Sequence, residues 1–466
     1  MPTAGPSRKS SALRAVPPIF GAVVRPLQAF FQLEAASGIV LLACALAALA
    51  WVNLAGTDTY QAVFENPITL GLGDDVVRFT LRQLVNDGLM TVFFFVVGME
   101  IKRELVLGEL RTAAQAALPG IAALGGMAFP AALFLAFNWG GPGQAGWGIP
   151  MATDIAFCIG VLTLLKTRVP HALIVFVTAL AIFDDVGGII VIALFYGHGL
   201  QAAWLLAAGA VAIAIFVMAR WHVGSAFAYA GAGLLLWYAL HHGGIHATIA
   251  GVVLGLMIPA RARERSRDTL EQLARHTAAL LRTPSDEELD GEAIGSIDET
   301  LEDLQGPLTR FVHWLHPWVA FVIMPLFALA NSGVDLRGLD ASQLTGRVAV
   351  GTAVALLGGK LLGIFSFTVA AVKAGIAPMP GRASFAKLLG VSVVAGIGFT
   401  VALFIAGLAY PGQPELLDQA KVGILAGSLT AGIAGTVLLR LTPVTDATGG
   451  QTQRAREPMK VGTTTV

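Results

Sequence analysis

The amino-acid sequence predicts an all-α protein that crosses a membrane many times. Hydrophobic residues make up 55% of the 466-residue chain and charged residues only 13%, whereas soluble proteins average about 25% charged residues. The mean hydropathy is +0.72. Since a hydrocarbon core about 30 Å thick takes about 20 apolar residues per helix, segments near that length indicate spanning helices.

Twelve segments of this kind are separated by polar breaks. Their predicted bounds are 36–55, 84–103, 115–137, 148–166, 172–196, 202–219, 225–241, 245–260, 317–333, 348–373, 385–410 and 420–440. The tail before the first segment is rich in Pro and Ser and has neither a long apolar core nor a small-residue cleavage site. We therefore expect no cleaved signal peptide.

Lys and Arg residues concentrate in alternate connections between these segments. The richer connections hold Lys102, Arg103, Arg111, Lys166, Arg168, Arg220, Arg261, Arg263, Arg265, Arg267, Lys373 and Arg382. The connections 138–147, 197–201 and 242–244 have none. Because positively charged loops stay in the cytoplasm, the sequence predicts cytoplasmic N- and C-termini.

The predicted parts of the chain follow from these segments. They are a cytoplasmic tail at 1–30, helices one to eight within 31–260, a cytoplasmic insertion at 261–309, helices nine to twelve within 310–441 and a second cytoplasmic tail at 442–466. Cys44 and Cys158 lie in separate apolar segments, which argues against a disulfide or metal site. The chain lacks a phosphate-binding glycine motif, and its formal net charge of zero indicates no nucleic-acid partner.

The first outward connection contains the stretch ITLGLGDDVVRFTL at 68–81. Its alternating residues around Gly73 to Asp75 predict a small β-hairpin, with an irregular capping loop as the alternative. Since a two-stranded hairpin is only marginally stable alone in water, we expect it to pair with another element.

Four ionisable residues lie well inside predicted helices: Asp154, Asp184, Asp185 and Lys360. Each costs about 2.5–3.5 kcal/mol at the centre of a spanning helix on insertion scales. The alternative is a purely structural role, in which a buried ion pair only fixes the register of the helices. It does not account for three acids against one base.

Asp184 and Asp185 are adjacent, so on a helix they point about 100° apart. One can therefore pair with Lys360 while the other faces a water-filled cavity. A buried carboxylate can hold either a proton or a hard cation, for which oxygen ligands are suited. When a proton and a cation compete for one carboxylate site, binding of one releases the other, and this is the chemistry of ion exchange.

The fourth and eleventh segments are interrupted by helix-breaking and polar residues. Pro150, Thr153 and Asp154 interrupt the fourth segment. Gly396, Gly398 and Thr400 interrupt the eleventh. Paired interruptions of this kind indicate discontinuous helices around an ion site in the middle of the membrane.

Seven longer motifs occur along the chain, in order from about residue 30 to 440. They are FFFVVGMEIKREL (93–105), ATDIAFCIGVL (152–162), LAIFDDVGGIIVIALFY (180–196), GGIHATIAGV (243–252), HPWVAFVIMPLFALANSGV (316–334), GGKLLGI (358–364) and GIGFTVALFIAGLA (396–409). With these motifs in this order, the sequence resembles the NhaA-type sodium/proton antiporters.

The resemblance implies a twelve-helix exchanger of the bacterial inner membrane, with inverted repeats and with helices 4 and 11 unwound and crossing. It implies that Asp185 and Asp184 bind Na⁺ and protons, with Asp185 the principal ligand. Thr153 and Asp154 would belong to the broken-helix assembly. Asp154 would offset the positive half-helix ends, and Lys360 would offset the negative ones and pair with Asp184.

The resemblance also implies pH sensing by Glu100, Glu104, His246 and His313. An interfacial charge cluster is the alternative for the two glutamates, and a packing role is the alternative for His246 and for Asp87. The chain departs from the family in two features: Val312 precedes His313 where an acid is common, and the 261–309 insertion is longer than usual.

The predicted activity is secondary antiport that exports Na⁺, and Li⁺, for inward-moving protons, electrogenically, without ATP or a bound cofactor. The predicted partners are the ions, the lipid bilayer and a second copy of the chain bound through the 68–81 hairpin. Two other functional classes are the alternatives. An intramembrane aspartyl protease is suggested by GLGD at 71–74, and a passive cation channel by the buried acids.

Overall fold

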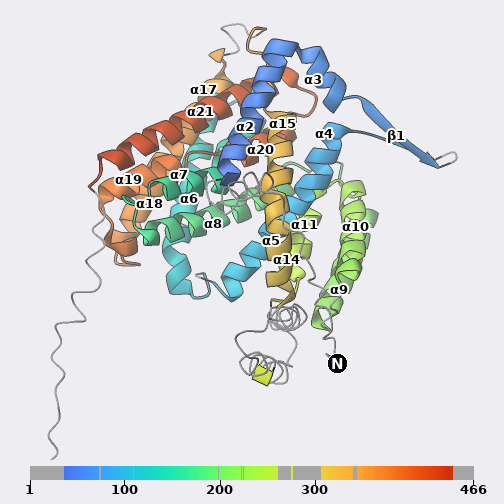
Figure 1. Cartoon of the computed structure of the whole chain (residues 1–466), viewed down its shortest axis with the longest axis horizontal. Coiled ribbons are helices and arrows are strands. Elements are labelled where there is room, and N and C mark those ends of the chain that lie inside the picture. Colours follow the sequence, from blue (N-terminus) through green and yellow to red (C-terminus); the bar gives the residue numbers. More distant parts are fainter. Residues whose placement is uncertain are drawn as a thin grey trace, which may run out of the picture.

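A computed structural model describes residues 36–443, apart from 73–74, 109, 198, 222, 224, 261–273, 276–305 and 339–343. The predicted N-terminal tail at 1–30, nearly all of the predicted insertion and the C-terminal tail from residue 444 onward lie outside the described residues. The described chain is largely helical (Figure 1).

Eight uninterrupted helical stretches are long and apolar enough to cross a membrane within the described ranges. They are Ala36–Ala55, Leu81–Val106, Ala113–Asn138, His171–Phe195, Ala202–Arg220, Pro307–Asn331, Arg347–Lys373 and Pro414–Leu441. Two further pairs of helices bend at a short break. Counting each bent pair as one span brings the number to ten.

Several of these stretches change helix type along their length. In chain order they are built from α2 (Ala36–Ala50) and η1 (Trp51–Ala55); α4 (Leu81–Gln83), η2 (Leu84–Leu89) and α5 (Met90–Val106); α6 (Ala113–Asn138); α8 (His171–Phe195); α9 (Ala202–Arg220); α14 (Pro307–Trp318), η4 (Val319–Ile323) and α15 (Met324–Asn331); α17 (Arg347–Val354), η5 (Ala355–Gly359) and α18 (Lys360–Lys373); and α21 (Pro414–Leu441). The segments η1, η2, η4 and η5 are π-helical turns.

The two bent pairs fall on the fourth and eleventh predicted segments. The first pair joins the 3₁₀ segment η3 (Pro142–Met151) to α7 (Ile155–Leu164) at 44°, and the second joins α19 (Phe385–Val394) to α20 (Phe399–Ala409) at 47°. The segments predicted at 225–241 and 245–260 fall on α10 (Ala226–His242) and α11 (Thr248–Met257), which are shorter than a full span. The count of twelve spanning helices therefore stays a prediction.

The predicted bounds were wrong at two helix starts. The ninth segment begins at Pro307 rather than at 317, and the twelfth begins at Pro414 rather than at 420. Both first turns place a proline at the start of the helix, where its missing N–H costs nothing. Arg310, Glu415 and Asp418 make these turns polar, so a search for apolar runs passes over them.

The helices form two bundles (Figure 1). In the first, α11 packs on α5, α9 and α10, while α14 packs on α5 and α15 on α2. In the second, α6 packs on α8, α17 and α18, and α21 packs on α17, α19 and α20. The two bundles meet where α2 contacts α7, α15 contacts α20 and α5 contacts α8. Both bent pairs belong to the second bundle.

Glycines allow α6 and α18 to approach backbone to backbone. A Cβ on Gly363 would lie 2.1 Å from the carbonyl oxygen of Gly125, and a Cβ on Gly359 would lie 2.6 Å from the Cα of Pro130. Small residues at such crossings let membrane helices pack closely. These two glycines lie on either side of Lys360 in the sequence. The close packing of α18 on α6 therefore fixes the position of the lysine backbone.

Two antiparallel strands occupy the stretch for which the sequence predicts a hairpin. They are β1 (Pro67–Leu72) and β2 (Asp75–Thr80), paired from Pro67 with Thr80 to Leu72 with Asp75. They project from the body beyond α3 (Thr57–Phe64), as Figure 1 shows. The predicted turn involves residues 73–74, which lie outside the described residues. The GLGD stretch thus begins on a strand and not within a spanning helix.

Candidate ion-binding site

The two adjacent acids lie in the middle of α8, which packs against α6 and α7 in the second bundle. Asp184 is 2% exposed and Asp185 is 7% exposed. A carboxylate buried among apolar helices needs a charged partner or hydrogen-bond donors to remain ionised. The partners of the two acids therefore decide what each one can do.

One oxygen of Asp184 carries two contacts. The Lys360 Nζ donates to Asp184 Oδ2 at 2.5 Å, and the Thr153 Oγ1 donates to the same oxygen at 2.7 Å. The side chains of Asp184 and Lys360 are both fully buried. The other oxygen, Oδ1, is buried and has no hydrogen-bond partner in the described part of the chain. It is an acceptor with no donor.

Asp185 makes neither a hydrogen bond nor an ion pair with any described residue. Its neighbour on α8 takes the lysine, as the 100° offset between adjacent helical residues requires. One acid of the pair is therefore held by protein groups, and the other has no such contact among the described residues.

Asp154 joins the two bends. Its Oδ1 accepts from the Phe157 N–H at 3.1 Å, and its Oδ2 accepts from Thr400 through the backbone N–H at 3.1 Å and the hydroxyl at 2.5 Å. Its own N–H donates to the Ile397 carbonyl at 2.7 Å. One carboxylate thus caps the N-termini of both α7 and α20, where the helix dipoles favour negative charge.

Two more bonds hold the bends side by side. The Thr153 hydroxyl also lies 3.2 Å from the Ala395 carbonyl, and the Cys158 thiol donates to the Val394 carbonyl at 3.1 Å. Residues 153–158 and 394–400 are therefore one hydrogen-bonded assembly within the second bundle. Lys360 donates to Asp184 and to none of the described carbonyls at the negative half-helix ends, so the structure does not show the second predicted contact of this lysine.

Comparison with known proteins decides the family. Residues 28–439 match the sequence profile described as Na+/H+ antiporter 1. The Na(+)/H(+) antiporter NhaA of Anaeromyxobacter sp. (strain Fw109-5) is 66% identical over 439 residues, which cover 94% of this chain and 96% of the relative. The chain belongs to the Na+/H+ antiporter 1 family.

Other relatives agree with this assignment. The Na(+)/H(+) antiporter NhaA 1 of Myxococcus xanthus (strain DK1622) is 56% identical over 91% of this chain and 95% of its own length. The solved structure of the sodium proton antiporter MjNhaP1 from Methanocaldococcus jannaschii at pH 8 superposes with a TM-score of 0.50, covering 91% of this chain and 99% of that one. At 14% identity it shows a shared fold only.

Members of the family are secondary transporters and not enzymes, so the protease interpretation is wrong for this chain. The chain is a multi-pass membrane protein of the antiporter class rather than a channel. Within the described ranges no group of three or more His, Cys, Asp and Glu side chains is placed to hold a metal ion.

The four residues with a predicted pH-sensing role do not form one cluster. On α5, Glu100 Oε1 lies 3.3 Å from the His316 Nδ1 of α14, and Glu104 lies 3.7 Å from Arg103. His313 is exposed on α14. His246 lies at the other end of the first bundle, where its Nδ1 is 2.8 Å from the Thr248 Oγ1.

Two of the contacting residues were not among the predicted site residues. Thr400 binds Asp154 more closely than any other side chain does, and its position just after Gly398 is the signal that marks it as part of a helix break. His316, rather than His313, reaches Glu100. Both histidines lie on the same helix, and only packing of α14 on α5 decides between them.

Replacing Lys360 by Ala should lower the thermal stability of the protein, because Asp184 would keep its charge in a buried site without its partner. Removing one member of a buried ion pair costs about 3–5 kcal/mol. Lys373→Ala, at the exposed end of the same helix, is the matched control and should melt as wild type does. The measurement is thermal unfolding in detergent.

The double variant Lys360→Ala with Asp184→Asn removes both charges. It should regain much of the stability that Lys360→Ala loses, since no unpaired charge is left buried. Equal melting temperatures for wild type and Lys360→Ala would contradict the pairing.

Proposed function

We propose that this protein exports Na⁺, and Li⁺, from the cell in exchange for a larger number of inward-moving protons, using the acid pair of α8. The observation that carries the proposal is the difference in contacts between the two acids. Asp184 is held by Lys360 and Thr153 through one oxygen, whereas its second oxygen and the whole Asp185 carboxylate have no partner among the described residues.

Na⁺ and a proton compete for this pair. A hard cation is attracted to ionised carboxylate oxygens, and protonation removes the charge that attracts it. We assign Asp185 as the principal ligand and proton carrier, because it forms neither an ion pair nor a hydrogen bond with any described residue. Asp184 supplies its free oxygen, Oδ1, as a second ligand.

In this proposal Asp154 and Thr153 hold the acid pair and the two helix bends in a fixed geometry. All three acceptor contacts of Asp154 are made to the starts of two helices, so we assign it to neutralising the dipole ends and not to carrying ions. Thr153 links this assembly directly to Asp184. Movement of the bends would therefore change the geometry of the acid pair.

Two routes make the exchange electrogenic. If Na⁺ binds only when both Asp184 and Asp185 are ionised, each cycle returns two protons for one Na⁺. If Lys360 keeps Asp184 ionised throughout, Lys360 itself gives up the second proton when Na⁺ binds. In either route net positive charge moves inward, and a negative interior contributes about 2.3 kcal/mol per charge per 100 mV.

The proposed setting is a bacterial inner membrane with both termini in the cytoplasm, as the distribution of Lys and Arg indicates. The hairpin then lies on the outer side. Regulation by pH is proposed at the opposite end, where Glu100 of α5 faces His316 of α14 and Glu104 and His313 lie on the same two helices. His246 lies at the hairpin end, away from these residues. Its proposed part in pH regulation depends on its contact with Asp87 at 3.7 Å.

Sodium-dependent current on a solid-supported membrane tests the exchange. Wild-type proteoliposomes should give a current upon addition of Na⁺ or Li⁺, because each cycle moves net charge. Asp185→Asn, nearly equal in volume, should fold but give none. Asp58→Asn, at an exposed aspartate of α3, is the control and should retain the current.

Two outcomes would contradict the proposal. Current in well-folded Asp185→Asn would remove this residue from the role of carrier. Exchange in wild type that produces no current and ignores a potential clamped with potassium and valinomycin would leave one proton per sodium.

We also propose a homodimer formed through residues 68–81. Among the described residues the sheet has two strands, so each strand has an edge that no described strand covers, and free edges pair readily with another chain. Deleting 70–79 should therefore yield monomers that still exchange ions, because the acid pair lies within one chain. Native mass spectrometry reports the oligomeric state. A dimer that persists after the deletion would refute this interface.

A further inference from the structure

Two buried tyrosines of the second bundle bind the same stretch of backbone. The Tyr410 hydroxyl donates to the Gly143 carbonyl at 2.7 Å, and the Tyr196 hydroxyl donates to the Ala145 carbonyl at 2.8 Å. The Tyr196 hydroxyl also accepts from the Gly148 N–H at 3.3 Å. All three bonds fall on the 3₁₀ segment η3, which forms the first half of the fourth span.

Glycines let η3 lie directly against the two hydroxyls. A Cβ on Gly148 would lie 2.8 Å from the Tyr196 hydroxyl oxygen, and a Cβ on Gly146 would collide with the Tyr410 hydroxyl. Only a backbone without side chains at these positions can approach so closely. The local sequence of η3 is therefore suited to receiving these tyrosines.

Tyr410 stands at the end of α20 that is farther from the bend. It follows Thr400, which holds Asp154, by ten residues, or about 15 Å of helix rise. At one end of α20 the fourth span is thus bound through Asp154, and at the other end it is bound through Gly143. The two elements are joined at both ends.

Tyr196 has the same relation to α8. It follows Asp184 by twelve residues, or about 18 Å of helix rise. Thr153 of the fourth span donates to Asp184, and Tyr196 binds η3 of the same span. The fourth span is therefore also joined to α8 at two well-separated places.

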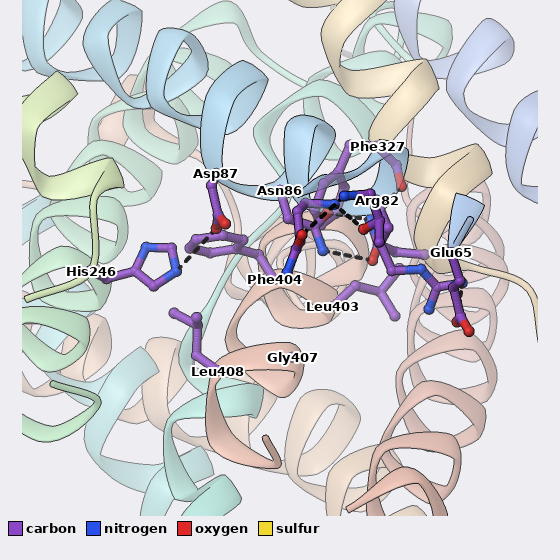
Figure 2. A pocket seen from close by; sticks show the side chains of 13 residues that line it. Glu65, Arg82, Asn86, Asp87, His246, Phe327, Leu403, Phe404, Gly407 and Leu408 are labelled. Carbon is purple, nitrogen blue, oxygen red and sulfur yellow. Dashed lines mark hydrogen bonds and ion pairs between the residues drawn. The ribbon is translucent and has the colours of Figure 1, made fainter. Parts of the chain in front are cut away.

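The contacts of α20 with the first bundle are of a different kind. Leu403, Phe404, Gly407 and Leu408 of α20 line a pocket between the bundles, opposite Asn86 and other polar groups (Figure 2). These four residues have no side-chain hydrogen-bonding group. Because polar side chains hold membrane helices together more specifically than apolar ones do, the hydrogen bonds at the ends of α20 tie it to the fourth span.

We propose that Tyr196 and Tyr410 are positioning residues of the ion site, a tyrosine clamp that holds the fourth span against α8 and α20. Thr153 and Asp154 lie at the other end of this span, so their placement beside Asp184 depends on both ends being held. With the clamp intact the site is already arranged for Na⁺. Without it, only a fraction of molecules has the binding geometry, and the apparent affinity falls by that fraction.

This inference rests on the proposed antiport and adds residues that set its ion affinity without touching the ion. It is tested with Tyr196→Phe, Tyr410→Phe and the double variant, which remove hydroxyls and keep the rings. One hydrogen bond shifts an equilibrium by about 2- to 10-fold. The double variant should raise the Na⁺ concentration for half-maximal current by at least such a factor. The maximal current should stay near that of wild type, because the acids are unchanged.

Two other tyrosines supply matched controls. The buried Tyr60 hydroxyl donates to the Leu329 carbonyl of α15 at 2.7 Å, so Tyr60→Phe removes a similar bond outside the second bundle. It should leave the half-maximal Na⁺ concentration unchanged even where it lowers the melting temperature. The buried Tyr229 hydroxyl of α10 has no hydrogen-bond partner in the described part of the chain, and Tyr229→Phe should change neither quantity.

A half-maximal Na⁺ concentration in the double variant no higher than that of Tyr60→Phe would overturn the clamp and leave the tyrosines a structural role only. Should the double variant give no current, its Na⁺ affinity is read from the concentration that stabilises the purified protein against heat. The two proposals fail separately. Absent sodium-dependent current in wild type would reject the proposed function, whereas normal current with unchanged affinity in the variants would reject only the clamp.

Discussion

The rest of the structure depends on one constraint, which is the cost of placing carboxylates inside a membrane. Three acids lie buried in the second bundle, and two of them are held by protein groups. Asp184 has the ammonium of Lys360 and the hydroxyl of Thr153, and Asp154 has the N-termini of two helices and the hydroxyl of Thr400. Asp185 and the second oxygen of Asp184 have no hydrogen-bond partner among the described residues, and that asymmetry is what makes exchange possible in the proposed function.

The helix geometry serves this arrangement. Bends of 44° and 47° expose backbone N–H groups in the interior, where a continuous helix has none to offer. The π-helical turn η5 ends immediately before Lys360, and such turns are frequent at functional sites. The glycine contacts of α18 with α6 then hold the lysine in position. The bends, the π turn and the close packing all act on the position of the same few charges.

The fold class and the buried ionisable residues could be predicted from the sequence, because charged residues in apolar runs are conspicuous. The interrupted segments were found for the same reason, since Pro150 and Gly398 break an otherwise regular pattern. What could not be predicted depends on packing between distant helices. Nothing local distinguishes His316 from His313 as the partner of Glu100, and nothing local shows that the Tyr410 hydroxyl reaches the Gly143 carbonyl.

The central claim is that Na⁺ and protons compete for the acid pair, and the most direct measurement is proton release on sodium binding. Purified protein in weakly buffered detergent solution, with a pH-sensitive dye, would be titrated with NaCl and, as a control, with choline chloride. Competition for the pair predicts that Na⁺ acidifies the solution, that choline does not, and that Asp185→Asn releases fewer protons or none. Sodium binding without any proton release over the range in which the protein transports would contradict it.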